Sequence, residues 1–122
     1  MDPMSVHDLE EKLAEYADAL VDLIGEHEKL TDELARATSA YERKFHAKRA
    51  ELYLADGKMR VDAIESIART HAADEYDALK VVEFREQFCR HAMHSYRQVL
   101  SAFQTRGKFV ADEAGHGRYG RR

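Results

Sequence analysis

The sequence predicts an all-α protein: a long antiparallel helical hairpin with a short connecting helix and coiled-coil-like packing. Apolar residues near the N-terminus recur at alternating spacings of four and three for more than four heptads, which is typical of a helix that packs along one stripe. The 122 residues include one proline and six glycines, too few turn residues for a β-sandwich or barrel. This length also fits one domain, since domains usually have roughly 100–150 residues.

The first helix is expected to begin after Ser5, an N-cap residue whose capping-box partner is Asp8. It should continue, straight or gently bent, through Gly25 to Asp56, with Gly57 as its C-cap. Ten residues form its predicted seam: Leu9, Leu13, Tyr16, Leu20, Leu23, His27, Leu30, Leu34, Ala37 and Tyr41. The pattern then continues through Phe45, Ala47, Ala50, Leu52 and Leu54.

A short second helix is expected from Met59 to near Ala73, and Asp74 is the expected N-cap of a long third helix that ends or bends at Gly107. The apolar stripe of the second helix consists of Val61, Ile64, Ile67 and Ala68. The predicted seam of the third helix consists of Leu79, Val81 or Val82, Phe84 or Arg85, Phe88, Ala92, Ser95, Tyr96, Val99 and Phe103. Two long helices joined through a short segment should run antiparallel.

The organisation that follows is a helical hairpin domain over residues 1–110 and a flexible basic Gly/Arg tail over residues 111–122. Charge is unevenly distributed, because residues 1–40 hold eleven acidic and three basic residues, whereas residues 41–122 hold sixteen basic and twelve acidic ones. Such asymmetry can mark a nucleic-acid-binding end. It can equally arise from acids of the first helix that screen bases of the third. The candidates are Asp18, Asp22 and Glu26 with Arg90, Arg97 and Arg106.

No motif in the sequence predicts catalysis, a metal site or a cofactor. A nucleophile elbow, a P-loop and a dinucleotide fingerprint are all missing from the sequence. Cys89, His91 and His94 cannot share an ion on a helix, because Cys89 is turned about 200° from His91. Cys89 is therefore expected in the core as a small apolar residue. No apolar run approaches the roughly 20 residues of a membrane span, so we expect a cytoplasmic protein.

Binding surfaces are the remaining candidates for function. Ile24, Val82, Phe84 and Leu100 flank the seams and are hard to bury in one hairpin, so they are the candidate protein contacts and favour a homodimer. The tail offers a weaker nucleic-acid contact, since arginines beside an aromatic residue can bind single strands. Its candidate residues are Arg118, Tyr119, Arg121 and Arg122.

Three segments, Lys48–Lys58, Val61–Glu65 and Leu100–Lys108, resemble small all-helical proteins encoded by phages and prophages, particularly of actinobacteria. The resemblance covers roughly residues 40–112, contains no catalytic signature and carries over no functional residue. It implies a phage accessory or host-takeover protein in the host cell cytoplasm. We therefore expect a non-enzymatic module that binds another protein. The alternative is a nucleic-acid-associated accessory factor of phage replication or recombination.

Overall fold

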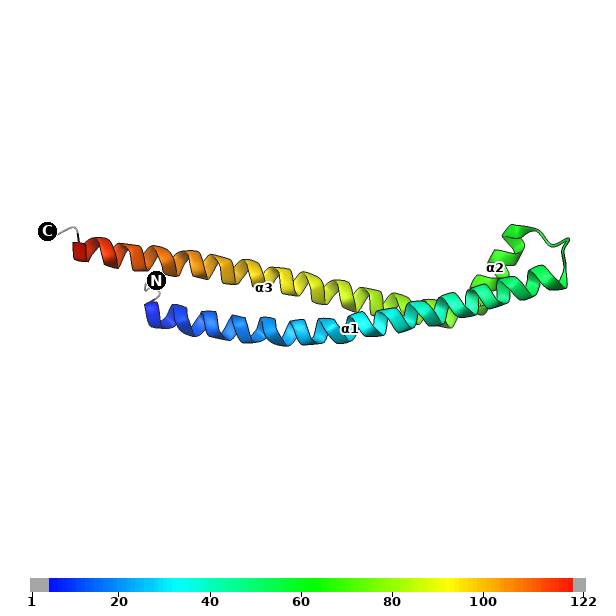
Figure 1. The fold of residues 1–122 in the computed structure, drawn as a ribbon, viewed down its shortest axis with the longest axis horizontal. Coiled ribbons are helices and arrows are strands. Elements are labelled where there is room, and N and C mark those ends of the chain that lie inside the picture. Colours follow the sequence, from blue (N-terminus) through cyan, green and yellow to red (C-terminus); the bar gives the residue numbers. More distant parts are fainter. Residues whose placement is uncertain (1–4, 120–122) are drawn as a thin grey trace. The chain divides into compact units, whose positions relative to one another are not determined.

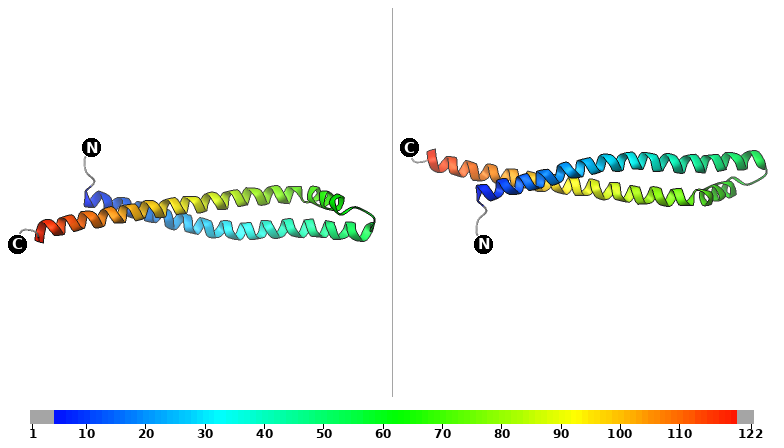
Figure 2. Two further views of the ribbon diagram at one scale, coloured as in Figure 1. Left: turned by 90° about the horizontal axis from the view of Figure 1, so that it is seen from above. Right: turned by 90° about the horizontal axis from the view of Figure 1, so that it is seen from below.

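Three α-helices make up the fold in a computed structural model that describes the backbone of residues 5–119 and the side chains of residues 5–108. They are α1 (Val6–Ala55), α2 (Val61–His71) and α3 (Ala73–Tyr119). The long helices α1 and α3 pack antiparallel, and the short helix α2 joins them (Figures 1 and 2). The predicted all-α hairpin with a short connecting helix is therefore confirmed. None of the helices within residues 5–119 has both the length and the apolar character needed to cross a bilayer.

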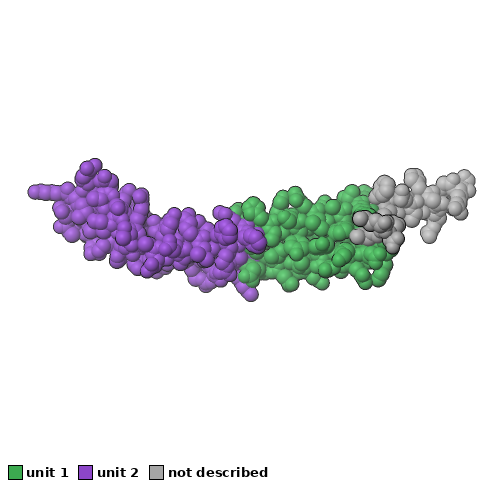
Figure 3. All heavy atoms as spheres, turned by 180° about the vertical axis from the view of Figure 1, so that it is seen from behind, with its two compact units in different colours: residues 1–26, 89–122 green, residues 27–88 purple. Residues whose placement is uncertain are grey.

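The chain forms two compact units, and each contains a stretch of both long helices (Figure 3). One unit combines residues 1–26 with residues 89–122, and the other consists of residues 27–88 and includes α2. In the first unit, the ring of Tyr16 lies 5.6 Å from the rings of both Tyr96 and Phe103. In the second, the ring of Tyr41 lies 5.5 Å from that of Tyr76. Aromatic pairs across the helices thus contribute to the core of each unit.

The capping box at the start of α1 is confirmed. The backbone N–H of Ser5 donates to Asp8 Oδ2 at 3.3 Å, and the backbone N–H of Asp8 donates to Ser5 Oγ at 3.1 Å. These reciprocal bonds satisfy N–H groups that have no partner within the helix. The hydrogen bonds to the Ser5 side chain and backbone lower the pKa of the Asp8 carboxyl below its ordinary value of 3.8.

The predicted seam of α1 is also confirmed. All ten residues from Leu9 to Tyr41 are buried or half-buried, and Leu9 and Leu30 are only 3% exposed. The helix is continuous through Gly25, where an added Cβ would meet no atom within 4 Å. Its last turns differ from the prediction, because Ala47, Ala50 and Leu54 are exposed.

The end of α1 is built by Asp56 and not by a left-handed glycine. No glycine of the described backbone has a positive φ, so Gly57 is not the C-cap that the sequence predicts. Instead, Asp56 Oδ1 accepts a hydrogen bond from the Lys58 backbone N–H at 2.9 Å, and the Asp56 carbonyl accepts one from Met59 at 3.3 Å. An Asx turn of this kind redirects the chain without the left-handed conformation that favours glycine.

Helix α2 buries half of its predicted stripe. Ile64 and Ala68 are fully buried, whereas Val61 and Ile67 are 57% and 41% exposed. Only the buried Ala72 separates α2 from α3. Asp74 consequently lies within the first turn of α3, where its charge favours the helix dipole, and is not the predicted N-cap.

The seam of α3 agrees with the prediction at Leu79, Val82, Ala92, Tyr96 and Phe103 and differs from it at the positions between them. Most of the buried or half-buried residues follow an alternating spacing of three and four that starts at Ala72, just before the helix: Ala72, Glu75, Leu79, Val82, Glu86, Cys89, Met93, Tyr96, Leu100, Phe103 and Gly107. Glu83 and Ala92 are also half-buried. Phe84, Phe88, Ser95 and Val99, which the sequence placed in the seam, are exposed. The acidic side chain of Glu86 occupies a seam position because it pairs with His27 of α1, as described below.

Gly107 lies inside α3 and does not end it. The helix continues to Tyr119, so the predicted tail over residues 111–122 begins within a helical backbone. An added Cβ at Gly107 would lie 3.0 Å from Leu9 Cδ2, closer than nearly all real contacts of this kind. The glycine therefore allows the two helices to approach closely at a buried leucine.

A charge placed in the α1 seam should destabilise the fold. Because Leu30 is 3% exposed, Leu30→Asp leaves an unpaired carboxylate in the core and should lower the free energy of unfolding by about 3–5 kcal/mol. Leu54→Asp is the matched control on the same helix, because Leu54 is 89% exposed, and it should cost less than about 1 kcal/mol. Urea unfolding followed by circular dichroism measures both. Equal losses for the two variants would contradict the seam.

The capping box should make stability depend on pH. Since the folded protein lowers the pKa of Asp8, the ionised carboxylate stabilises the fold above pH 3.8, and this contribution is lost as the pH falls through the folded pKa. In Ser5→Ala, the pKa of Asp8, measured by NMR titration, should rise toward 3.8. The difference in melting temperature between wild type and variant should narrow at acidic pH. An unchanged Asp8 pKa would contradict the reciprocal bonds.

Candidate interaction surface

Two polar pairs occupy seam positions in the unit formed by residues 27–88. His27 Nε2 and Glu86 Oε1 share a hydrogen bond of 3.0 Å, and Lys44 Nζ donates to Glu75 Oε1 at 2.7 Å. The side chains of Glu86 and Glu75 are only 14% and 26% exposed. The bond from Lys44, together with the backbone N–H of Glu75 itself, lowers the pKa of Glu75. Both carboxylates therefore face α1, and they set the rotation of α3 about its own axis.

This rotation leaves three apolar side chains on the opposite side of α3. Val81, Phe84 and Phe88 are 58%, 71% and 71% exposed. Their spacings of three and four residues place them in one row on the helix surface. We call these three residues the outer row. Both phenylalanines of the row are more exposed than Tyr53 and Tyr76, which are 45% and 43% exposed.

The four predicted protein contacts divide into two groups. Phe84 is 71% exposed and Ile24 is 36% exposed, so both are accessible to a partner. Val82 and Leu100 are half-buried seam residues of α3, so the hairpin itself covers much of their surface, contrary to the expectation that they would be left uncovered. The expectation for Val82 and Leu100 failed because the rotation of α3 about its axis was predicted incorrectly in this part of the helix. Phe88 was assigned to the seam, and Val81 was one of two alternatives for it, so both were missed as surface residues.

Three basic residues between positions 43 and 60 have acidic partners within their own unit. Lys44 pairs with Glu75, Lys48 Nζ lies 3.3 Å from Glu51 Oε1, and Arg60 Nε lies 3.3 Å from Asp62 Oδ1. The guanidinium of Arg49 lies 5.6 Å from the centre of the Phe45 ring. These pairs reduce the positive potential that a nucleic-acid-binding stripe over this segment would need.

One acid of α1 pairs with a base of α3. Arg85 Nη1 donates to Glu33 Oε2 at 3.3 Å. The predicted screening acids Asp18, Asp22 and Glu26 are exposed. Their pairing with the bases of α3 stays a prediction. The predicted tail contacts Arg118, Tyr119, Arg121 and Arg122 lie outside the residues whose side chains are described.

Cys89 lies in the core, as predicted. It is 5% exposed, and its Sγ lies 3.5 Å from the carbonyl oxygen of Leu23. His91 and His94 are exposed on the same helix. Among the described side chains, no three His, Cys, Asp or Glu residues are placed to hold a metal ion.

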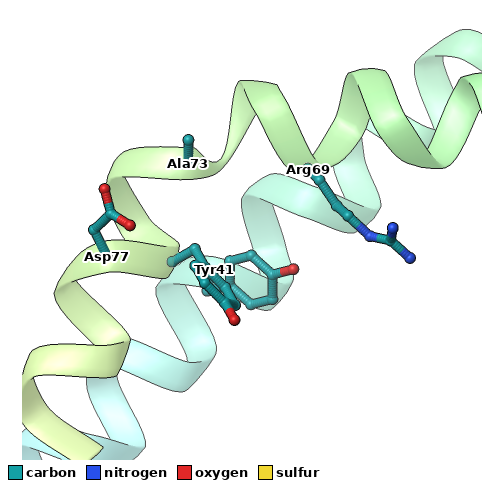
Figure 4. Close-up of a pocket in the computed structure, with 5 residues that line it drawn as sticks. Tyr41, Arg69, Ala73 and Asp77 are labelled. Carbon is teal, nitrogen blue, oxygen red and sulfur yellow. The ribbon is translucent and has the colours of Figure 1, made fainter.

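A hollow of about 390 Å³ lies where the three helices meet in the unit of residues 27–88 (Figure 4). It is lined by Tyr41, Arg69, Ala73, Tyr76 and Asp77. Arg69 and Asp77 lie at opposite ends of it, with Tyr41 between them (Figure 4). Arg69 also lies 3.6 Å from Glu65 on its own helix. The hollow thus has an aromatic floor and one charge of each sign at its rim.

Comparison with protein-family models, with curated proteins and with solved structures found no match to this chain. The resemblance to phage-encoded helical proteins therefore stays a prediction from the sequence. The proposal for the function rests on the geometry of the described residues.

Proposed function

We propose that this protein is a non-catalytic, helical protein-interaction module that binds another protein through the outer row of α3. The observation that carries the proposal is the exposure of Phe84 and Phe88, each 71% accessible, on a helix whose other side forms the seam with α1. Contiguous aromatic surface of this kind marks interaction sites in soluble proteins more often than solitary apolar residues do.

Energetics support the same conclusion. An aromatic side chain stabilises a fold by leaving water, so Phe84 and Phe88 contribute little to the hairpin that displays them. A partner that covers both rings would gain this hydrophobic contribution at the interface. Aromatic residues at the centre of an interface commonly supply most of the binding energy.

A helix is the partner element that the row fits best. Val81, Phe84 and Phe88 lie along the axis of α3 at the spacing by which one amphipathic helix recognises another. Together with the resemblance to phage-encoded proteins, this favours an accessory protein that acts by contact in the host cytoplasm. The rival nucleic-acid role is less favoured by residues 43–60, because three of the cations there, Lys44, Lys48 and Arg60, have acidic partners.

A photo-crosslinker at the outer row tests this function in the cells that produce the protein. Benzoylphenylalanine at Phe84 should crosslink to a specific protein, because this position is buried in the complex. The matched control is benzoylphenylalanine at Leu54, which is 89% exposed but lies at the end of α1. Phe88→Ser should reduce the yield from position 84 at least tenfold. The same crosslinking pattern from positions 84 and 54 would contradict the proposal.

A further inference from the structure

We propose that the outer row binds an amphipathic helix of another protein, and that an arginine of this helix enters the hollow beside the row. This inference rests on the proposed function, because it names the chemistry of the partner that the same row accepts. Three observations in the unit of residues 27–88 carry it. They are the position of Asp77, the lack of a counter-charge for it among the described residues, and the aromatic lining of the hollow.

Asp77 continues the outer row toward α2. A helix turns by about 100° per residue, so Asp77 lies within about 20° of both Phe84 and Phe88 around the axis of α3. It precedes Val81 by four residues, which makes the two side chains neighbours on the helix surface. Asp74 lies one turn further along, within about 40° of Phe88. The apolar row therefore ends in two exposed acids.

Neither acid has a counter-charge in the described part of the chain. The side chains of Asp74 and Asp77 make no hydrogen bond or ion pair with the side chains of residues 5–108. Lys80, three residues after Asp77, is paired with another acid, since its Nζ lies 3.0 Å from Glu83 Oε2. A positively charged partner supplies the missing counter-charge, whereas the phosphates of a nucleic acid are repelled from this end of the row.

The hollow of about 390 Å³ adjoins the same end of the row, because Asp77 and Ala73 form its α3 wall. The rings of Tyr41 and Tyr76, whose centres lie 5.5 Å apart, form its floor. Arg69 stands at the opposite end from Asp77 (Figure 4). The volume of the hollow is at the lower end of the range for ligand sites. A long side chain at this end of the row therefore reaches both the carboxylate and the rings.

The chemistry of the lining selects a cation. Lys80 Nζ already lies 5.2 Å from the centre of the Tyr76 ring, and the face of such a ring attracts positive charge. Arg69 does not neutralise Asp77, because it lies 3.6 Å from Glu65 on its own helix. Arginine fits best, since its planar guanidinium pairs with a carboxylate through two hydrogen bonds and stacks on aromatic rings.

The spacing of the row defines the sequence pattern of the partner helix. Val81, Phe84 and Phe88 follow Asp77 by four, seven and eleven residues. A helix packed along the row therefore needs apolar residues at these same distances from its arginine, counted in one direction or the other. The apolar residues cover the phenylalanine rings, and the arginine fixes the register, because only one alignment brings it to Asp77. Hydrophobic contact thus supplies affinity, and the charge supplies specificity.

Two synthetic peptides test this contact by fluorescence anisotropy. Each is a labelled helix of alanine and glutamine that carries three leucines and one arginine at the spacing of the row. The arginine precedes the leucines in one peptide and follows them in the other. One of the two should bind the wild-type protein with a Kd below about 100 μM. It should bind at least tenfold tighter than the same peptide with glutamine in place of the arginine, because only arginine pairs with Asp77.

Variants of the protein locate the bound peptide. Phe84→Ser should weaken binding at least tenfold, and Asp77→Asn should remove the advantage of the arginine peptide over the glutamine peptide. Both side chains are exposed, so both variants should keep their helical circular dichroism. Asp32→Asn changes an exposed acid of α1 and should preserve the advantage. No binding of either arginine peptide at about 100 μM, or an advantage that persists in Asp77→Asn, would overturn the proposal.

A second copy of the chain is the other candidate for the row, in line with the homodimer expected from the sequence. Sedimentation equilibrium of the protein alone measures its mass against the 14.0 kDa of one chain. A mass that Phe84→Ser leaves unchanged supports a different partner at the row. A dimer that dissociates in Phe84→Ser would show that a second copy covers the row, and the proposal would then be wrong.

The outcomes also separate this inference from the proposed function. If position 84 crosslinks to a different protein in a Phe88-dependent way, but Asp77→Asn leaves the yield unchanged, the arginine contact is wrong and the proposed function stands. If the peptides bind as described but position 84 crosslinks to no specific protein in cells, the chemistry of the row is supported and the proposed function is not.

Discussion

The antiparallel seam between α1 and α3 is the constraint on which the rest of the structure depends, and its two polar pairs determine its phase. Leucine and other apolar seam residues pack acceptably in several registers, because a shift by one heptad replaces one apolar contact by another. A half-buried carboxylate has no such freedom, since it must meet a donor. Glu86 meets His27, and Glu75 meets Lys44. A heptad shift would separate both pairs at once.

Glu75 shows why a different rotation of α3 would be unfavourable. Its Oε1 is bound by Lys44, while its Oε2 is buried and has no hydrogen-bond partner among the described residues. A carboxylate in this position depends strongly on its one charged donor. The same rotation that satisfies Glu75 and Glu86 turns Phe84 and Phe88 toward solvent. The exposure of the outer row is therefore a consequence of pairing the half-buried acids Glu75 and Glu86 with donors of α1.

Sequence reasoning succeeded where one physical signal dominated. The α1 seam from Leu9 to Tyr41 contains few competing apolar residues, so its phase was evident, and Ser5 with Asp8 is a strong local capping signal. In α3, aromatic residues occur on both sides of the helix, so hydrophobicity alone placed Phe88 in the seam and left Phe84 and Arg85 as alternatives for it. The observed phase half-buries two acids, Glu75 and Glu86, which becomes favourable only through partners more than thirty residues away in the sequence.

The remaining misses have similar causes. Gly57 and Gly107 were both predicted to end helices because glycine is common there. Gly57 instead lies in an Asx turn, and Gly107 allows Leu9, from a distant part of the sequence, to approach closely. The candidate surface could be predicted in part, because Phe84 was selected as a protein contact. Its neighbours Val81 and Phe88 could be assigned to the surface only once the pairing of Glu86 was known.

The most direct test of this account is to exchange the charges of Lys44 and Glu75 and to measure thermal unfolding of the wild type, the two single variants and the double variant. Lys44→Glu and Glu75→Lys should each lower the melting temperature, because each places two like charges in the seam. The double variant should recover most of the loss, since the opposite charges meet again at the same level. Losses that simply add in the double variant would show that this pair does not set the phase and register of α3.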